Sequence, residues 1–131
     1  MEQRVVNPWT WQEQFGYVQA KEVSGAERTL WCAGQTSVDD EGNPLHEGDM
    51  VAQVLQALDN LETVLRHGGF ELSDVVRLNY YVTDVDAFMG AGEALGRRLG
   101  EAGCQASGTL LGVSRLAFPQ LVVELEATAV R

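Results

Sequence analysis

Basic side chains are scarce in this sequence. Nine Lys and Arg residues stand against 19 Asp and Glu, which gives a formal net charge of −10. A nucleic-acid-binding surface needs clustered positive charge to neutralise phosphates. A chain with this balance would repel a phosphate backbone, so we expect no nucleic-acid partner.

Cysteine is equally sparse. Cys32 and Cys104 are the only two, they lie far apart, and there is no Cys-x-x-Cys pair. This excludes a disulfide scaffold and a structural zinc site, and we expect both thiols to be reduced. His46, Glu47 and Asp49 are possible metal ligands, but their spacing matches no metal motif. We interpret them as a solvated loop that ends in a helix-capping Asp.

Long apolar runs, internal repeats and low-complexity tracts are also missing. No stretch approaches the roughly 20 apolar residues that a membrane span needs, and the first residues are mixed in character rather than apolar. We therefore expect no membrane association and a cytoplasmic location. The 131 residues suit one domain with its own core, so residues 1–131 are predicted to form a single domain.

Strands are indicated where apolar residues alternate between turn residues. Residues 17–23 and 28–33 flank a short loop, which predicts a hairpin. The alternation over residues 75–83 predicts a strand with apolar cover on one side only. Two more strands are expected over residues 108–113 and 121–130. A short run at residues 4–6 counts as a further, N-terminal strand.

The apolar period becomes helical from residue 49, with Asp49 as the expected N-cap and the Gly68-Gly69 pair as the stop. One face collects Val51, Val54, Leu55, Leu58, Leu61 and Leu65, and the residues predicted to face away are Gln53, Asp59, Glu62 and Arg66. A second helix is expected from residue 84 or 86 to residue 100 or 103, although its glycines lower its intrinsic propensity. Both helices should pack on the sheet.

The final strand has two different faces. Leu121, Val123, Leu125, Ala127 and Ala129 point one way, and Val122, Glu124, Glu126, Thr128 and Val130 point the other. Helices can cover only one face of so small a sheet. The mixed face should find another partner, most simply copies of itself in a closed ring, so we predict an oligomer.

Seven segments, in this order, resemble the Rid proteins, the reactive intermediate deaminases also called the YjgF-like family. Each is short, but together they cover nearly the whole chain. They are GYVQA at 16–20, AGQ at 33–35, QALDNL at 56–61 leading to Gly68-Gly69, DVVR at 74–77, TDVDAF at 83–88, GVSRL at 112–116 and ELEATA at 124–129.

The resemblance implies an α+β, chorismate-mutase-like fold, with a mixed sheet and two helices on one face. It also implies a homotrimer whose sheets form a central barrel, with a small-molecule cleft at each subunit interface. Archetypal members hydrolyse imines and enamines such as 2-aminoacrylate to the keto acid and ammonia. They use neither metal nor organic cofactor, so none is expected here.

One family feature is missing. Archetypal members read Pro-Ala-Arg-Ser or similar before the fifth strand, and that arginine grips the substrate carboxylate as guanidinium forks commonly do. Here the matching position is Gly108, within Ala-Ser-Gly-Thr at 106–109. Arg115 matches a separate family arginine and is no replacement. A charge-assisted pair contributes roughly 1.5–3 kcal/mol. Without it, an amino-acid-derived substrate should bind about ten- to a hundred-fold more weakly.

The resemblance assigns the remaining roles. Glu124 matches the carboxylate that polarises the hydrolytic water, and is the predicted catalytic acid/base. Glu126 is a further family carboxylate that we interpret as structural. Tyr17 and Phe88 match residues of the ligand cleft. Residues 106–109, where Gly108 replaces the family arginine, are called the altered corner below. Within it, the hydroxyl groups of Ser107 and Thr109 and the accessible backbone of Gly108 are predicted to contact ligand.

Two readings stay open. One is an enzyme that adds water to, deaminates or tautomerises an imine-, enamine- or enol-like metabolite. The other is a non-catalytic protein that binds or senses a small metabolite. A ribonuclease is disfavoured by the acidic balance, and Cys104 has no basic neighbour in sequence to activate it. Whether Trp9 and Trp11 line the cleft is left undecided.

Overall fold

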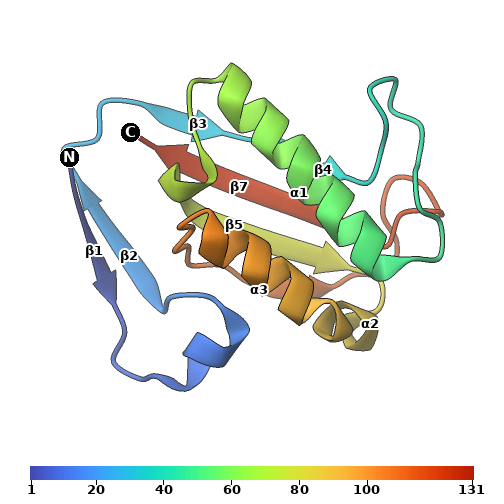
Figure 1. Cartoon of the computed structure of the whole chain (residues 1–131), viewed down its shortest axis with the longest axis horizontal. Coiled ribbons are helices and arrows are strands. Elements are labelled where there is room, and N and C mark those ends of the chain that lie inside the picture. Colours follow the sequence, from blue (N-terminus) through green and yellow to red (C-terminus); the bar gives the residue numbers. More distant parts are fainter.

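A mixed five-stranded sheet forms the centre of the protein, as a computed structural model that describes all 131 residues shows (Figure 1). The strand order is β3-β7-β5-β6, and β4 also pairs with β7. Strand β7 is antiparallel to its partners, whereas β6 is parallel to β5. The strands are β3 (Thr29–Trp31), β4 (Gln35–Thr36), β5 (Val75–Val82), β6 (Leu110–Gly112) and β7 (Val123–Val130).

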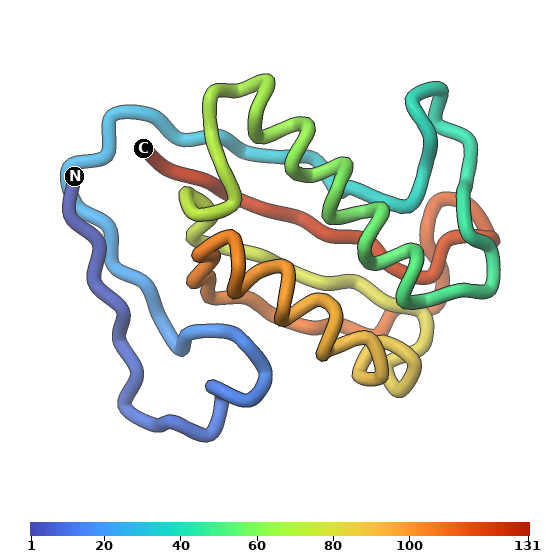
Figure 2. Tube along the Cα trace, viewed as in Figure 1, coloured from blue at the N-terminus to red at the C-terminus, as the bar shows by residue number.

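The helices lie together on one face of this sheet, as the trace in Figure 2 shows. Helix α1 (Met50–His67) packs on β7 and β4. The second expected helix is divided into α2 (Val85–Gly90) and α3 (Gly92–Glu101), with the break at Ala91. Glycines on both sides of Ala91 explain the interruption, because glycine is a poor helix former. No helix combines the length and apolar content that crossing a bilayer demands.

The predicted hairpin of residues 17–23 and 28–33 is wrong. Strand β2 (Ala20–Ser24) pairs with β1 (Glu2–Val6) in a separate two-stranded sheet beside the main body (Figure 1). Strand β3 instead joins the C-terminal end of β7, where the Arg131 carbonyl accepts hydrogen bonds from the Glu27 and Arg28 amides at 2.9 Å. The loop between β2 and β3 therefore connects two sheets.

Helix α1 begins as predicted, because the Asp49 side chain accepts a hydrogen bond from the Ala52 amide at 3.0 Å. Gln53, which the sequence pattern placed on the outer face, is fully buried. Its amide donates to the Gln120 carbonyl at 2.8 Å, and its oxygen accepts from the Val122 amide at 3.0 Å. A helical period cannot distinguish this buried polar clamp from a solvated glutamine. Val51, predicted to be in the core, is exposed.

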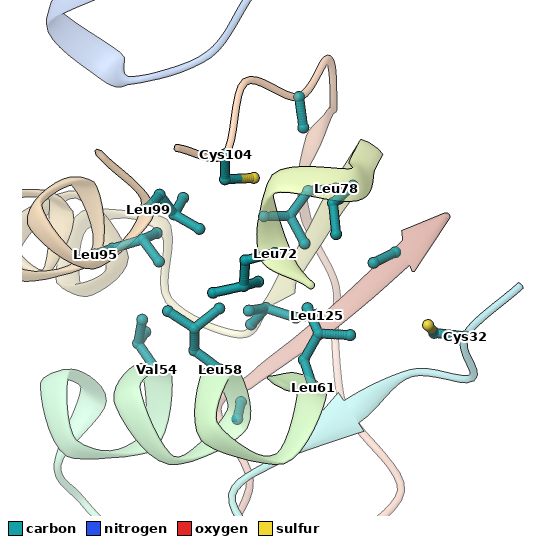
Figure 3. Close-up of a cluster of buried hydrophobic side chains, with 14 of the residues drawn as sticks. Cys32, Val54, Leu58, Leu61, Leu72, Leu78, Leu95, Leu99, Cys104 and Leu125 are labelled. Carbon is teal, nitrogen blue, oxygen red and sulfur yellow. The ribbon is translucent and has the colours of Figure 1, made fainter. Parts of the chain in front are cut away.

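The core lies between the helices and the inner face of the sheet (Figure 3). Leu58, Leu61 and Leu65 of α1 are fully buried, as the helical period predicts. Along β7 the odd-numbered residues from Val123 to Ala129 are buried, while the alternate residues are only partly covered. This confirms the two-faced final strand. Cys32 and Cys104 lie on separate sides of the core and are free thiols (Figure 3).

Candidate functional site

A cleft of about 960 Å³ opens on the helical side of the sheet. One wall is the 3-10 turn η1 (Trp11–Phe15) with Gly16 and Tyr17. The Val18 amide, next to this wall, donates to the Ala106 carbonyl at 3.1 Å and ties the segment to the altered corner. The opposite walls come from helices α2 and α3 and from the β5–β6 edge of the sheet. The cleft therefore joins a segment near the N-terminus to elements between residues 78 and 110.

Four of the five predicted ligand-binding residues line this cleft: Tyr17, Phe88, Gly108 and Thr109. The fifth, Ser107, is not among the lining residues, and its hydroxyl donates to the Val76 carbonyl at 3.2 Å. The structure thus brings the four residues together from three separate segments. Their part in ligand binding stays a prediction.

Aromatic rings form much of the lining. Trp11 and Tyr17 meet edge to face with centroids 6.3 Å apart, and Tyr80 and Phe88 are tilted with centroids 5.1 Å apart. Trp11 therefore lines the cleft, which settles the question left open for it. Trp9 is exposed and lies outside the lining. A mainly apolar cavity with few polar groups is the usual form of a small-molecule site.

The corner at Gly108 is built around the absence of a side chain. A Cβ atom there would lie 1.8 Å from the Leu78 carbonyl oxygen. The carbonyls on either side still accept β-ladder bonds, since the Leu78 amide donates to Ser107 and the Tyr80 amide to Thr109, both at 2.9 Å. Any side chain at position 108 would push these strands apart. Replacing Gly108 with arginine would therefore not simply restore the family's carboxylate clamp.

Side-chain charge on the cleft wall is entirely acidic. Glu13 and Glu93 are its only charged lining residues, and no Lys, Arg or His lines it. Cys104 does line the cleft, but burial raises the pKa of its thiol to about 11. It is therefore a neutral wall residue near pH 7 rather than a nucleophile.

Glu124 lies on the other face of the sheet. It sits in register with Tyr81 and Thr36, while its neighbours Val123 and Leu125 point into the core. Its carboxylate lies over Gly34, where a Cβ atom would meet Oε1 at 1.9 Å. Gly34 thus leaves the space that this carboxylate occupies, a role that the sequence analysis missed.

The two carboxylates of this face differ in acidity. Partial burial, and then repulsion from Glu126, raise the pKa of Glu124 above its usual value. Hydrogen bonds from the Tyr81 hydroxyl at 2.8 Å and the Asn79 amide at 3.2 Å lower the pKa of Glu126. Glu126 is therefore held as a structural anion, whereas Glu124 has no hydrogen-bond donor and is the more basic group.

Other residues singled out in the sequence have local roles. Asp49 caps α1, and no three His, Cys, Asp or Glu side chains gather in a way that would hold a metal ion. Arg115 donates to the Leu116 carbonyl at 3.3 Å and lies outside the cleft. Gly92 and Gly96 of α3, seen in the sequence only as helix-weakening residues, line the cleft. Apart from those of adjacent residues and the helix backbone, no atom lies within 4 Å of the position that a Cβ would take at either glycine.

This fold and cleft define a class of α+β protein with helices on one side of a mixed sheet and a mainly apolar cleft beside them. Residues 12–131 match the family model described as endoribonuclease L-PSP. The chain therefore belongs to this family, the Rid or YjgF-like proteins.

Individual relatives agree with this assignment. A RutC family protein of Pyrococcus horikoshii is 30% identical over 100 residues, which is 76% of this chain and 77% of the relative. The crystal structure of the Rid family protein YyfB from Yersinia pestis, a protein of unknown function, matches all of both chains with a TM-score of 0.88 and 36% identity. The mouse 2-iminobutanoate/2-iminopropanoate deaminase is 32% identical over 72 residues, 55% of this chain and 51% of that protein.

The structural match confirms the chorismate-mutase-like α+β fold that the resemblance implied. The likeness to the mouse deaminase covers about half of each chain, so it identifies kinship and not a shared substrate.

Proposed function

We propose that this protein hydrolyses or tautomerises an imine- or enamine-type metabolite that has no carboxylate group, with Glu124 as the acid/base. The observation that carries this proposal is a ligand-sized aromatic cleft in which the family's arginine position is a glycine that cannot accept a side chain. Kinship with imine deaminases supports the reaction class.

In hydrolysis, water adds to the imine carbon while Glu124 accepts a proton from that water. The same group returns the proton to nitrogen, which gives a carbinolamine. A second proton then passes from the carbinolamine hydroxyl to nitrogen through Glu124 as the C–N bond breaks, and the products are a carbonyl compound and ammonia or an amine. A carboxylate whose pKa is raised toward neutrality suits both proton transfers. Tyr17 and the polar backbone at Gly108 and Thr109 would orient the ligand.

The site requires more than one copy of the chain. In a single chain, Glu124 and the cleft lie on opposite faces of the sheet. We therefore propose the homotrimer that the family resemblance implies, in which the Glu124 face of one subunit meets the cleft of the next. This arrangement gives the open sheet face the partner that it lacks.

The second candidate is a metabolite-binding protein without turnover. The separation of Glu124 from the cleft within one chain favours it, because binding needs only the cleft whereas hydrolysis needs both parts. We do not propose a ribonuclease despite the family's description, because the cleft is acidic and the net charge is −10.

Turnover of two imines tests the reaction. Release of ammonia from freshly generated 2-aminoacrylate should stay near the background rate, because nothing in the cleft wall neutralises its carboxylate. The imine of benzaldehyde and methylamine, which has no carboxylate, should be hydrolysed faster than in buffer, as followed by its ultraviolet absorbance.

The variant Glu124→Gln should lower hydrolysis of that imine at least about 100-fold, the usual contribution of a general acid/base, with ligand affinity unchanged. Glu126→Gln is the matched control, since an amide oxygen can still accept from Tyr81. Efficient turnover of 2-aminoacrylate by the natural protein would refute the carboxylate-free proposal. Ligand binding with no turnover of either imine would leave the binding protein as the function.

A further inference from the structure

The charged side chains and the aromatic lining of the cleft indicate what kind of ligand it takes. We propose that the cleft selects a positively charged organic amine or iminium ion with an apolar or aromatic body. This inference rests on the proposed function only in taking the cleft as the ligand site, and it names the class of ligand.

The first observation is the distribution of charge. Glu13 and Glu93 lie on the cleft wall with no basic partner lining it. Glu93 has a single contact with Arg97 at 3.4 Å, on the exposed surface of α3, which is too open to neutralise it fully. Glu13 has no ion pair.

The basic residues nearest the cleft either bind another residue or do not line the cleft. Arg77 donates to the Thr109 hydroxyl at 3.0 Å from the opposite face of the sheet. Lys21 lies near enough to Cys104 to affect its thiol, but does not line the cleft. Glu13 and Glu93 are both exposed, so a ligand meets their negative charge where the cleft wall faces solvent. Lys21 is a rival anchor for an anion.

The second observation is the aromatic lining. Trp11, Phe15 and Tyr17 form one side, and Tyr80 and Phe88 form the other. The face of an aromatic ring carries negative potential and attracts organic cations, with Trp the strongest of the three types. Rings on two walls beside carboxylates favour an ammonium or iminium group over a neutral one.

Three ligands with one aromatic body test the inference: phenethylamine, 2-phenylethanol and 3-phenylpropanoate, whose head groups are positive, neutral and negative. Binding to the natural protein is measured by ligand-observed NMR titration. We expect the amine to bind about five-fold or more tightly than the alcohol, as one desolvated cation–π contact provides. The acid should bind most weakly, and the preference for the amine should shrink as salt is added.

Charge-matched variants separate local recognition from the general acidity of the protein. The double variant Glu13→Gln/Glu93→Gln should lose most of the preference for the amine while its affinity for the alcohol is unchanged. The double variant Glu47→Gln/Glu101→Gln removes the same number of charges outside the cleft and should keep the preference. Equal losses in both variants would attribute the preference to net charge and overturn the inference.

Other results overturn it directly. Equal affinity for the amine and the alcohol would show that the cleft does not discriminate between ligands by charge. Tightest binding of the acid, abolished in Lys21→Met, would make Lys21 a carboxylate anchor. No binding of any of the three ligands would mean that a second copy or another group fills the cleft. Preferential binding of the amine without imine turnover would refute the proposed reaction and support this inference. Imine turnover without a preference for the amine would support the reaction and refute this inference.

Discussion

Glu124 and Glu126 are two residues apart on one strand face, yet their surroundings shift their acidities in opposite directions. Glu124 lies over Gly34 without a hydrogen-bond donor, whereas Glu126 accepts from Tyr81 and Asn79. A raised pKa means that the folded state favours the protonated form, and a lowered pKa means the opposite. The same chemical group thus affects stability with opposite sign at the two positions.

This difference predicts opposite pH dependences for two variants. Ionised Glu124 opposes folding above the usual Glu pKa of 4.5, so Glu124→Gln should increase the free energy of unfolding at pH 7. The gain should decline as the pH falls through the raised pKa of Glu124 and disappear below its usual value of 4.5. Ionised Glu126 favours folding, so Glu126→Gln should decrease stability at pH 7, and this loss should disappear as the pH falls through its lowered pKa.

Urea unfolding of both variants and the natural protein, at pH 7 and at acid pH, measures these differences. Changes of the same sign at pH 7 would show that the two carboxylates do not have the distinct environments described above.

Helix α3 shows how one element serves both packing and the cleft. Leu95 and Leu99 bury its inner side, and Arg98 joins it to α1 through ion pairs with Asp59 and Glu62. Its glycines leave open space, since a Cβ at Gly96 or at Gly100 would meet nothing within 4 Å. Packing therefore does not require glycine at either position.

This element supplies a matched pair of substitutions. Both Gly96→Ala and Gly100→Ala should stabilise the protein, by up to about 1 kcal/mol, because alanine is the better helix former. The effect should be smaller at Gly100, which is near the end of α3. Gly96 lines the cleft and Gly100 does not, so only Gly96→Ala should weaken phenethylamine binding.

Thermal unfolding and the NMR titration measure the two effects separately. Equal weakening of binding in both variants would show that the methyl group at position 96 does not enter the ligand's space.

At the scale of the whole molecule, the open face of the sheet remains without cover in a single chain. Trp31, in register with Thr128 on this face, is 79% exposed. An uncovered tryptophan beside a half-buried strand face favours association. The proposed hydrolysis also needs a second copy, because Glu124 and the cleft lie on opposite faces of the sheet in one chain.

We predict a particle of about three times 14.3 kDa in sedimentation or light-scattering measurements. Thr128→Arg places a charge on the open face, between Trp31 and Arg77, and should shift the protein to monomers. Thr63→Arg adds the same charge on the exposed side of α1 and should remain trimeric. A natural protein that stays monomeric at high concentration would contradict the trimer, and with it the shared site.

Patterns local in sequence were sufficient for much of this description. The Asp49 cap, the α1 stripe and the two-faced β7 follow from periods of 3.6 and 2 residues, and seven short motifs identify the family. Local patterns failed where a partner is distant along the chain. The hairpin was misassigned because β3 pairs with the C-terminal strand, and Gln53 was placed outside because its partners lie near residues 120 and 122.

The sequence by itself determined the acidic character through its composition. Through the resemblance of its short motifs to a known family, it also determined the fold class and the missing arginine. Only the tertiary structure decided that Gly108 has no room for a side chain, that Glu13 and Glu93 share the wall of an aromatic cleft, and that Glu124 lies on the opposite side of the sheet. Those facts depend on which strands and helices meet in space, and the interactions that bring them together join residues far apart along the chain.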